Sequence, residues 1–372
     1  MKYIHVLDEF SLAGGGVRSV VADVSQEMAK MGLNVYILAL GIPQDADVDY
    51  LKEWAIEKNI HFDVLRNSNE SLLKAAKQLR RFLKQNLANE KCCLYLHLKR
   101  GVLAGIMGSI GIKNVRRVEV FHSNYINYKL QAFVCKHFLD HYLPVSKESR
   151  QQLMEEYGIK PNRITLAYNG LDVGKIRGQV TPINRNKDVF RILSVGRMAP
   201  PKNLETSIQA YSWFKKENDS IKSEYIIAGD GPQRREFEAL AAGDVSFLGM
   251  IGRGDVLSNI ASADVVLFPS LWEGHSIALL EVLAIGCPVI VTDIPSFREV
   301  LENKPLSKEE LFRPEPFGAV FQKGSIESCK AAIEYMVKNK ELYEEMKDYV
   351  SSFAENYTLQ KQTQIYVTTA QF

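Results

Sequence analysis

Short apolar runs alternate with amphipathic stretches along the first half of the chain. Runs at 3–7 and 34–40 predict buried strands, and the stretch at 17–31 between them has the spacing of an amphipathic helix that ends at Gly32. The later segments of this half are strands at 93–98 and 117–121, a basic amphipathic helix at 72–87, and closing apolar segments at 143–146 and 164–168. Strands separated by helices in this order predict a parallel sheet.

The alternation restarts after residues 174–189, a polar stretch with glycine and proline that predicts an interdomain linker. The predicted elements beyond it are strands at 190–195, 224–228, 245–248, 265–269 and 288–292, with helices from 204, from 233, around 257–261 and at 277–285. A helical segment at 325–353 follows, and we expect the tail at 354–372 to pack back on the first domain. The predicted fold class is therefore α/β, with Rossmann-like parallel-sheet domains at 1–173 and 190–353.

Two domains also fit the length of 372 residues, which is large for a single core. The 46% hydrophobic and 24% charged residues are typical of a soluble globular protein. We expect no signal peptide, because the first apolar run is too short and Asp8 and Glu9 interrupt it at once. We also expect no membrane span, because no uncharged apolar stretch approaches about 20 residues. The five cysteines form no CxxC pair and indicate neither a disulfide framework nor a zinc site, so a cytoplasmic location is expected. They are Cys92, Cys93, Cys135, Cys287 and Cys329.

Charge is distributed unevenly, although the net charge is only +2. Residues 1–180 carry a balance of +7 and residues 181–372 a balance of −5. Within the first half, residues 65–136 contain 14 basic and 3 acidic residues. Such a segment attracts phosphate, on an anionic membrane surface or on a pyrophosphate-linked acceptor. Ordinary solvated helix faces are an equally good interpretation.

The residues with the clearest chemistry lie at 268–281, where a predicted strand leads into a predicted helix. Ser276 fits the N-cap of that helix, so the free N–H groups of Gly274–Ile277 favour a diphosphate. Glu273 precedes the helix and Glu281 lies on it, about 10 Å apart if the stretch were wholly helical. This spacing suits a nucleotide-diphosphate sugar, which has hydroxyls at both ends and phosphates between them. Without further signals, two surface glutamates beside a buried helix would be the better interpretation.

Further signals come from a resemblance to a known family. Residues 273–281, EGHSIALLE, resemble the Glu-x7-Glu signature of glycosyltransferase family 4, the group 1 glycosyl transferases, which are retaining enzymes of the GT-B fold. Other segments that resemble the family are GRMAPPK at 196–202, GDGP at 229–232, FLGMI at 247–251, PVS at 144–146 and YNGLD at 168–172. The resemblance is strong over 190–300 and weaker elsewhere, and it implies two domains that face each other across a cleft.

The resemblance implies a role for each matching residue of the second domain. Arg197 and Lys202 would neutralise the departing diphosphate, and Glu273 would contact hydroxyls of the transferred sugar. Glu281 would bind the ribose. The remaining implied contacts are made by the backbone. Met250 and Ile251 would contact the base. Phosphate and sugar would be contacted by Gly274, His275, Ser276, Ile277 and Ala278.

In the first domain, the glycine loop Gly14-Gly15-Gly16 resembles the family's loop and would let backbone approach the donor closely. A tight turn explains a glycine loop equally well. His122, after the predicted strand at 117–121, matches the family's histidine and would hydrogen-bond the donor sugar near the reacting carbon. His97 is a lesser candidate of the same kind.

The resemblance implies front-face attack, in which the leaving phosphate takes the acceptor proton and no protein nucleophile is needed. The sequence contains no Gly-x-Ser-x-Gly motif and no metal-ligand cluster, so we expect neither a cofactor nor a metal. Asp45, Asp47 and Asp49 superficially form a metal-binding Asp-x-Asp pattern, which we interpret as a solvated loop.

The expected partners are a nucleotide-sugar donor, with UDP favoured, and a saccharide or lipid-linked acceptor in bacterial surface polysaccharide or glycolipid synthesis, but no nucleic acid. The alternatives are a sugar-nucleotide epimerase and a non-catalytic sugar-nucleotide-binding protein. A nicotinamide dehydrogenase is disfavoured, because the strand that ends at Leu40 offers no acid for a ribose. Contact with the inner face of the membrane through residues 65–136 is a further expectation.

Overall fold

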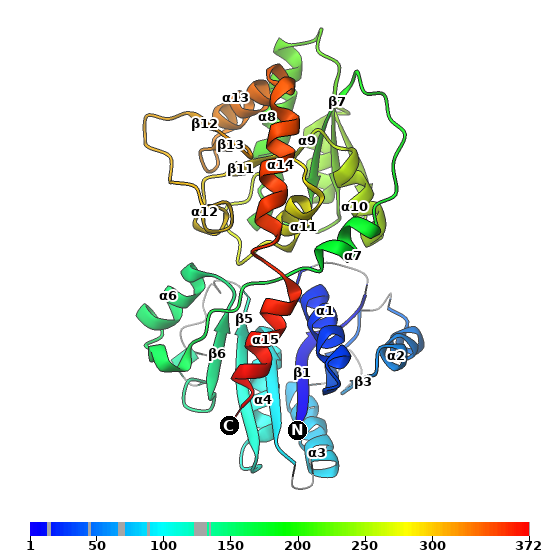
Figure 1. The fold of residues 1–372 in the computed structure, drawn as a ribbon, viewed down its shortest axis with the longest axis vertical. Helices are drawn as coiled ribbons and strands as arrows, with labels where there is room; N and C mark the ends of the chain where they lie inside the picture. The colour runs from blue at the N-terminus through cyan, green and yellow to red at the C-terminus, as the bar shows by residue number, and fades with distance from the viewer. Residues whose placement is uncertain are drawn as a thin grey trace. The chain divides into compact units, whose positions relative to one another are not determined.

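A computed structural model describes residues 1–12, 16–43, 46–65, 71–87, 90–122, 132–133 and 135–371. These residues form two compact units, which are described separately (Figure 1). The first unit contains residues 1–170 and the C-terminal residues from Leu359 onward, and the second contains Leu171–Thr358. None of the helices in the described residues is both long enough and apolar enough to cross a membrane.

The first unit is built on a six-stranded sheet in the order β3-β2-β1-β4-β5-β6, and all its strands pair in parallel. Its strands are β1 (Lys2–Glu9), β2 (Asn34–Gly41), β3 (Ile60–Val64), β4 (Cys92–His97), β5 (Val115–Phe121) and β6 (His141–Pro144). Its helices are α1 (Val17–Lys30), α2 (Val48–Glu57), α3 (Leu72–Asn86), α4 (Leu98–Ser109), α6 (Lys147–Glu155) and α15 (Leu359–Thr369).

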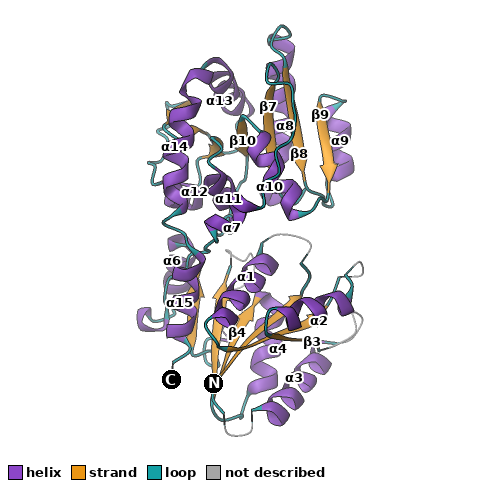
Figure 2. Ribbon diagram, turned by 45° about the vertical axis from the view of Figure 1, so that its right-hand side comes forward, coloured by secondary structure: helices purple, strands orange, loops and turns teal. Residues whose placement is uncertain are grey.

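Alternate residues of the central strands face opposite layers of helices, as a pleated strand requires. Ile4 and Val6 of β1 join the apolar core that includes residues of α3 and α4. His5, between them, stacks on Tyr366 of α15 instead. Helices α1 and α15 pack together over this second face (Figure 2).

The second unit contains a seven-stranded sheet in the order β12-β13-β11-β10-β7-β8-β9, which is parallel except for the β12–β13 pair. Its strands are β7 (Phe190–Val195), β8 (Ser223–Ala228), β9 (Val245–Gly249), β10 (Val265–Phe268), β11 (Val289–Thr292), β12 (Phe312–Glu315) and β13 (Gly318–Phe321). Its helices are α7 (Val173–Gly178), α8 (Leu204–Glu217), α9 (Arg234–Ala241), α10 (Arg253–Ser262), α11 (Ile277–Ile285), α12 (Pro295–Leu301), α13 (Ile326–Lys338) and α14 (Tyr343–Ala354). The two predicted Rossmann-like parallel sheets are confirmed.

The C-terminal segment belongs to the first unit through buried polar contacts as well as apolar packing. Gln362 of α15 accepts a hydrogen bond from the backbone N–H of Gly170 at 2.9 Å, and Tyr95 of β4 donates to the carbonyl of Tyr366 at 2.6 Å. Tyr366 is fully buried. The contacts between this helix and α1 place the tail where the sequence analysis expected it.

The structure differs from the predicted element boundaries in two places. The range 174–189, expected to be a linker, begins inside helix α7, where Arg177 donates to the carbonyl of Ala284 on α11 at 2.7 Å. The start of this range therefore packs on the second unit, and Thr181 and Arg185 also hydrogen-bond to that unit, whereas most of residues 179–189 are exposed. The helical segment at 325–353 divides into α13 and α14, which are joined by a short 3-10 turn at Lys340–Leu342.

Candidate functional site

The predicted residues of the second half meet at the carboxyl edge of the second sheet. Strands β10, β7, β8 and β9 are neighbours in that order and run in parallel, so the loops that follow them emerge at the same edge. Open parallel α/β sheets bind ligands at this edge. The loop after β7 carries Arg197 and Lys202, the loop after β9 carries Met250 and Ile251, and the loop after β10 carries the segment 273–281.

Two glycines let the loops after β7 and β8 approach each other with their backbones in contact. A Cβ placed on Gly229 would lie 2.0 Å from the carbonyl oxygen of Gly196, which no side chain permits. The φ angle of Gly229 is +146°, a conformation that L residues rarely adopt. A Cβ on Gly231 would lie 2.3 Å from the carbonyl oxygen of Met198. The GDGP segment is therefore needed for close approach to the loop that carries Arg197.

The helix start expected at residue 276 is confirmed. Ser276 has extended backbone angles, and its hydroxyl accepts a hydrogen bond from the N–H of Leu279 at 3.3 Å. The helix ends at Gly286, whose φ of +86° is typical of a left-handed C-terminal residue. Gly274, His275 and Ser276 are buried just before the first turn. The first N–H groups of such a helix favour an anion at this end.

Lys202 and Glu273 form an ion pair that joins the loop after β7 to the loop after β10. The Nζ atom of Lys202 lies 2.6 Å from Oε1 of Glu273, and the hydroxyl of Ser270 donates to the same oxygen at 2.8 Å. The backbone N–H of Leu271 donates to the carbonyl of Pro201 at 2.8 Å and holds the two loops in register. Both side chains of the pair are mostly shielded from solvent. The cation and the carboxylate are therefore held beside the helix start.

Glu281 is buried on α11 and is paired with Arg253, a residue that the sequence analysis did not single out. The Nε atom of Arg253 donates to Oε1 of Glu281 at 2.8 Å. Arg253 is the first residue of α10 and follows the loop that carries Met250 and Ile251. The sequence signal that could have pointed to Arg253 was its position just after the segment with Met250 and Ile251. The buried carboxylate of Glu281 thereby keeps a charged partner, and Arg253 lies beside the proposed nucleoside contacts.

The remaining predicted residues of this edge differ in exposure. Arg197 and Met250 are exposed, Ile251 and Ala278 are half-buried, and Ile277 is buried. His275 is buried with its ring centroid 5.1 Å from that of Tyr357. Burial lowers the pKa of His275 to about 3, so its imidazole is neutral at pH 7.

The first unit places His122 directly after β5, at the carboxyl edge of its own sheet. Its Nε2 atom lies 2.8 Å from Nδ1 of His97, and Nε2 of His97 lies 3.0 Å from Nδ1 of His5. Burial lowers the pKa of His5 and of His122 to about 3, and it lowers that of His97 well below its usual value. His97, the lesser candidate of the sequence analysis, is thus the middle member of a buried chain of neutral imidazoles.

The glycine loop of the first unit is described only from Gly16, which precedes α1 with a φ of +71°. Gly14 and Gly15 lie outside the described residues. The Asp-x-Asp pattern has a structural explanation at one of its positions: Asp47 caps α2 by accepting hydrogen bonds from the N–H groups of Asp49 and Tyr50. Asp45 also lies outside the described residues. The described residues contain no group of three or more His, Cys, Asp or Glu side chains that could hold a metal.

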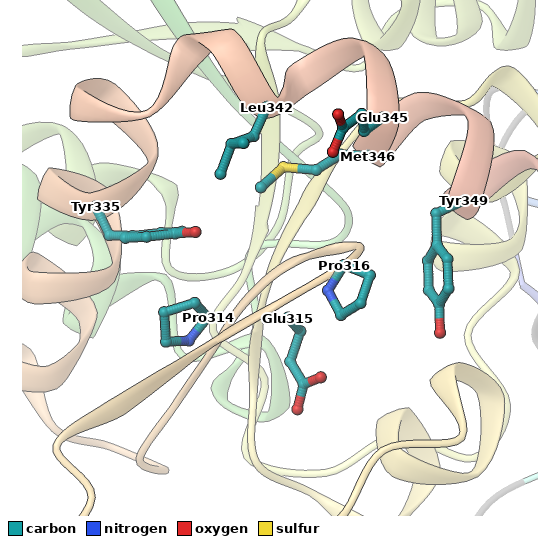
Figure 3. Close-up of a pocket in the computed structure, with 8 residues that line it drawn as sticks. All are labelled: Pro314, Glu315, Pro316, Tyr335, Leu342, Glu345, Met346 and Tyr349. Atoms are coloured by element: carbon teal, nitrogen blue, oxygen red, sulfur yellow. The ribbon is translucent and has the colours of Figure 1, made fainter.

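A separate pocket lies elsewhere in the second unit, between the β12–β13 hairpin and helices α13 and α14 (Figure 3). Its volume is about 420 Å³, and Tyr335 and Tyr349 contribute aromatic rings to its wall. None of the residues predicted for the donor lines it.

The chain matches two family descriptions that together cover most of its length. Residues 179–353 match the family described as Glycosyl transferases group 1, and residues 14–175 match Glycosyltransferase Family 4. Among curated relatives, an Escherichia coli protein named UDP-Gal:alpha-D-GlcNAc-diphosphoundecaprenol alpha-1,3-galactosyltransferase is 28% identical over 42% of this chain and 43% of its own length. A Streptococcus pneumoniae alpha-monoglucosyldiacylglycerol synthase is 22% identical over 78% of this chain and 70% of its own length. The chain spans about half the length of the first relatives that it matches.

Solved structures share the fold along the whole chain. A glycosyltransferase from Rickettsia africae aligns with a TM-score of 0.76 at 16% identity, over 99% of this chain and 97% of its own. HepE from Anabaena, solved in complex with UDP and glucose, aligns with a TM-score of 0.75 at 16% identity, over 99% of both chains. At this level of identity the likeness supports the fold and not the ligands.

Proposed function

Because the chain belongs to glycosyltransferase family 4 and has the two Rossmann-like sheets of the GT-B fold, we propose that it transfers a sugar from a nucleotide-diphosphate sugar to a saccharide or lipid-linked acceptor. The observation that carries the proposal is the ion pair of Lys202 with Glu273 beside the start of α11. A cation, a carboxylate and a helix start in one place suit a sugar linked to a diphosphate.

In this proposal the negative charge that develops on the leaving diphosphate is stabilised by Lys202, by Arg197 and by the first N–H groups of α11. Lys202 then exchanges its bond to Glu273 for a phosphate oxygen, which frees the carboxylate to accept hydrogen bonds from sugar hydroxyls. The pair thus keeps both groups neutralised until the donor arrives.

The nucleoside end of the donor is assigned to the neighbouring loop. Glu281 accepts hydrogen bonds from the ribose hydroxyls, with Arg253 holding its carboxylate in place at 2.8 Å. Backbone groups of Met250 and Ile251 contact the base, and the exposed Met250 side chain offers apolar surface to its ring. UDP is the favoured nucleotide; the E. coli relative is named for UDP-Gal, and HepE was solved with UDP and glucose.

We also propose that transfer retains the anomeric configuration by front-face attack. A phosphate oxygen of the leaving group takes the acceptor proton, and His122 hydrogen-bonds the transferred sugar near the reacting carbon. The setting that the relatives support is synthesis of bacterial surface polysaccharide or glycolipid.

A panel of UDP-, GDP-, ADP- and TDP-sugars tests the proposed donor. A bound donor raises the melting temperature, because a ligand that binds only the folded state stabilises it by mass action. We expect selective stabilisation by UDP-sugars. The stabilising donor is then incubated with candidate acceptors, and the anomeric configuration of the product is read by NMR. An epimerised donor in the absence of acceptor would establish the epimerase alternative instead, and binding without turnover would establish the non-catalytic one.

The charge stabilisation proposed here comes from the protein and needs no divalent metal. We therefore expect transfer to continue in EDTA at the rate seen without it. A rate that falls with chelation and returns with Mg²⁺ or Mn²⁺ would refute this assignment.

The basic face of the first unit is proposed to contact an anionic membrane that carries the acceptor. Helix α3 buries Leu79 and Leu83 and leaves four basic side chains exposed: Lys74, Lys77, Arg81 and Lys84. Vesicles of neutral and of anionic lipid at low and high salt test this contact. Binding should require anionic lipid and weaken with salt, whereas binding that ignores both would contradict it.

A further inference from the structure

Three buried histidines form one continuous hydrogen-bonded chain through the first unit. His5 lies in β1, His97 ends β4 and His122 follows β5, and these three strands are adjacent in the sheet. The ring nitrogens approach to 3.0 Å between His5 and His97 and to 2.8 Å between His97 and His122. The two pairs of rings stack with centroids 5.2 and 5.1 Å apart. The chain runs from the interior of the unit to the edge of its sheet.

The chemistry of neutral imidazole makes both hydrogen bonds run in the same direction. Each neutral ring has one N–H donor and one bare nitrogen acceptor, so His97 donates to one neighbour and accepts from the other. All three rings are neutral at pH 7, because burial lowers each pKa. Two arrangements remain, and they differ in which nitrogen of His122 carries the proton.

The inner end of the chain decides between the two arrangements. The Nε2 atom of His5 is buried and has no hydrogen-bond partner among the described residues. A buried N–H without an acceptor is rarer and more costly than a buried lone pair without a donor. Nε2 of His5 is therefore the bare nitrogen, and its Nδ1–H donates to Nε2 of His97. His97 in turn donates from Nδ1 to Nε2 of His122, which leaves the proton of His122 on Nδ1.

We propose that His97, oriented by His5, is a positioning residue that fixes His122 as the Nδ1–H tautomer, so that His122 donates a hydrogen bond to an oxygen of the transferred sugar. This inference rests on the proposed function, in which His122 contacts that sugar. From the sequence, His122 has a predicted role and His97 is a lesser candidate of the same kind, but neither His97 nor His5 could be placed behind His122, because they lie 25 and 117 residues away along the chain. The three histidines come together because β1, β4 and β5 are neighbours in the sheet.

The tautomers are measured directly in the full-length protein labelled with ¹⁵N at its 7 histidines. Two-bond ¹H–¹⁵N correlations identify the protonated nitrogen of each ring without any substrate. We expect Nδ1–H at His122 in the parent protein and a shift toward Nε2–H in His97→Phe, which removes the hydrogen bonds but keeps a ring. In transfer assays His97→Phe should lower kcat by about tenfold to a hundredfold and leave the KM of the donor within about twofold.

Two further variants separate positioning from a loss of structure. His97→Asn places an amide N–H near the position of Nδ1, and it should restore the tautomer of His122 and most of the lost kcat. His141→Phe is the matched control, because His141 is a partly buried histidine of the same unit that bonds Thr165 instead of this chain; both readouts should stay at the parent values.

An Nε2–H tautomer at His122 in the parent protein would overturn the inference, as would a His97→Phe variant with an unchanged tautomer or unchanged kcat. The tautomer measurement needs no donor. A parent protein with the Nδ1–H tautomer that transfers no sugar would therefore refute the proposed function while leaving the assignment of the proton intact.

Discussion

At the scale of single residues, the second unit holds two carboxylates, each against its own cation. Glu273 is bound to Lys202 and Glu281 to Arg253, at 2.6 and 2.8 Å. Each carboxylate is more buried than an isolated charge would tolerate, so removal of one partner leaves the other with an uncompensated charge. The two pairs differ in the part of the donor to which they are assigned. Lys202 and Glu273 are assigned to the reacting end.

Lys202→Ala and Glu273→Ala are each expected to reduce transfer by more than about a hundredfold, since both remove charge that is proposed to act on the departing diphosphate or on the sugar. Steady-state kinetics with the stabilising donor measures the loss. The variants should remain folded, as checked by circular dichroism and melting temperature. Lys215→Ala is the matched control, because it breaks a lysine–aspartate pair of the same unit, with Asp244, at 2.9 Å. Activity of both site variants within about tenfold of the parent would remove the proposed donor site.

At the scale of elements, the loops are placed by glycines and caps as much as by charge. Strands β7 to β11 and the starts of α8, α9 and α11 were predictable to within one residue, because these elements have apolar runs with clear boundary signals, such as Ser276 and Gly286 at the two ends of α11. Helices α7 and α12 and strands β12 and β13 of the same half were not predicted. In the first half, helices α2, α4 and α6 and strand β3 were not predicted. The amphipathic patterns of α2 and β3 are short, and Asp47, which caps α2, was interpreted as part of a solvated loop. The pairing of Arg253 with Glu281 depends on tertiary contact and leaves no periodic signal.

The close backbone contact between the loops after β7 and β8 should depend on Gly229. Gly229→Ala should destabilise the second unit by about 2–4 kcal/mol and weaken donor binding, because its Cβ would lie 2.0 Å from the carbonyl oxygen of Gly196 and backbone would have to move. Chemical denaturation and donor thermal shifts measure both effects. Gly178→Ala, in helix α7, meets no atom within 4 Å and should be neutral or slightly stabilising. Equal stability of the two variants would show that the close approach is not required.

At the scale of the whole molecule, the chain returns to its first unit after completing the second. The second unit is a continuous stretch, Leu171–Thr358, whereas the first needs both ends of the chain. This arrangement follows from α15, whose residues Gln362, Thr363 and Tyr366 are buried against the first sheet and its neighbouring segments. A sequence pattern can indicate that the tail is helical, but the partner of its buried face comes from the fold.

Deletion of residues 359–372 should therefore destabilise the first unit and leave the second intact. It removes the hydrogen bond between Gln362 and Gly170 and the one from Tyr95 to the carbonyl of Tyr366, and it uncovers the apolar face beneath them. Hydrogen exchange, read separately for the two units, should show lost protection in the first unit, β1 and β4 included, and unchanged protection in the second. A fragment of 171–358 should fold and bind the donor nucleotide, since it contains Arg197, Lys202 and both glutamates. Protection lost equally in both units would contradict this division.

Buried histidines are shared unequally between the units, and this gives each unit a different dependence on pH. His5, His97 and His122 lie in the first unit and His275 in the second, and burial lowers the pKa of each. The half-buried His141 adds a fourth such group to the first unit, because burial lowers its pKa to about 4. Below pH 6.5 these histidines become protonated in the unfolded chain, whereas those in the folded units with a pKa of about 3 stay neutral until the pH approaches that value. The free energy of unfolding is therefore greatest above pH 6.5 and falls as the pH falls. Between pH 7 and 5.5 each such histidine should cost about 1 kcal/mol.

The first unit should therefore lose about 3–4 kcal/mol over that interval and the second about 1 kcal/mol, because carboxylates titrate mostly at lower pH. Urea unfolding followed by hydrogen exchange in each unit measures the two losses. His275→Phe should abolish the loss in the second unit, whereas Tyr357→Phe, which alters the ring against His275 and keeps the titrating base, should preserve it. Equal losses of unfolding free energy in the two units would show that His5, His97 and His122 are not held neutral. The direction inferred for the hydrogen bonds between these three histidines would then lose its basis.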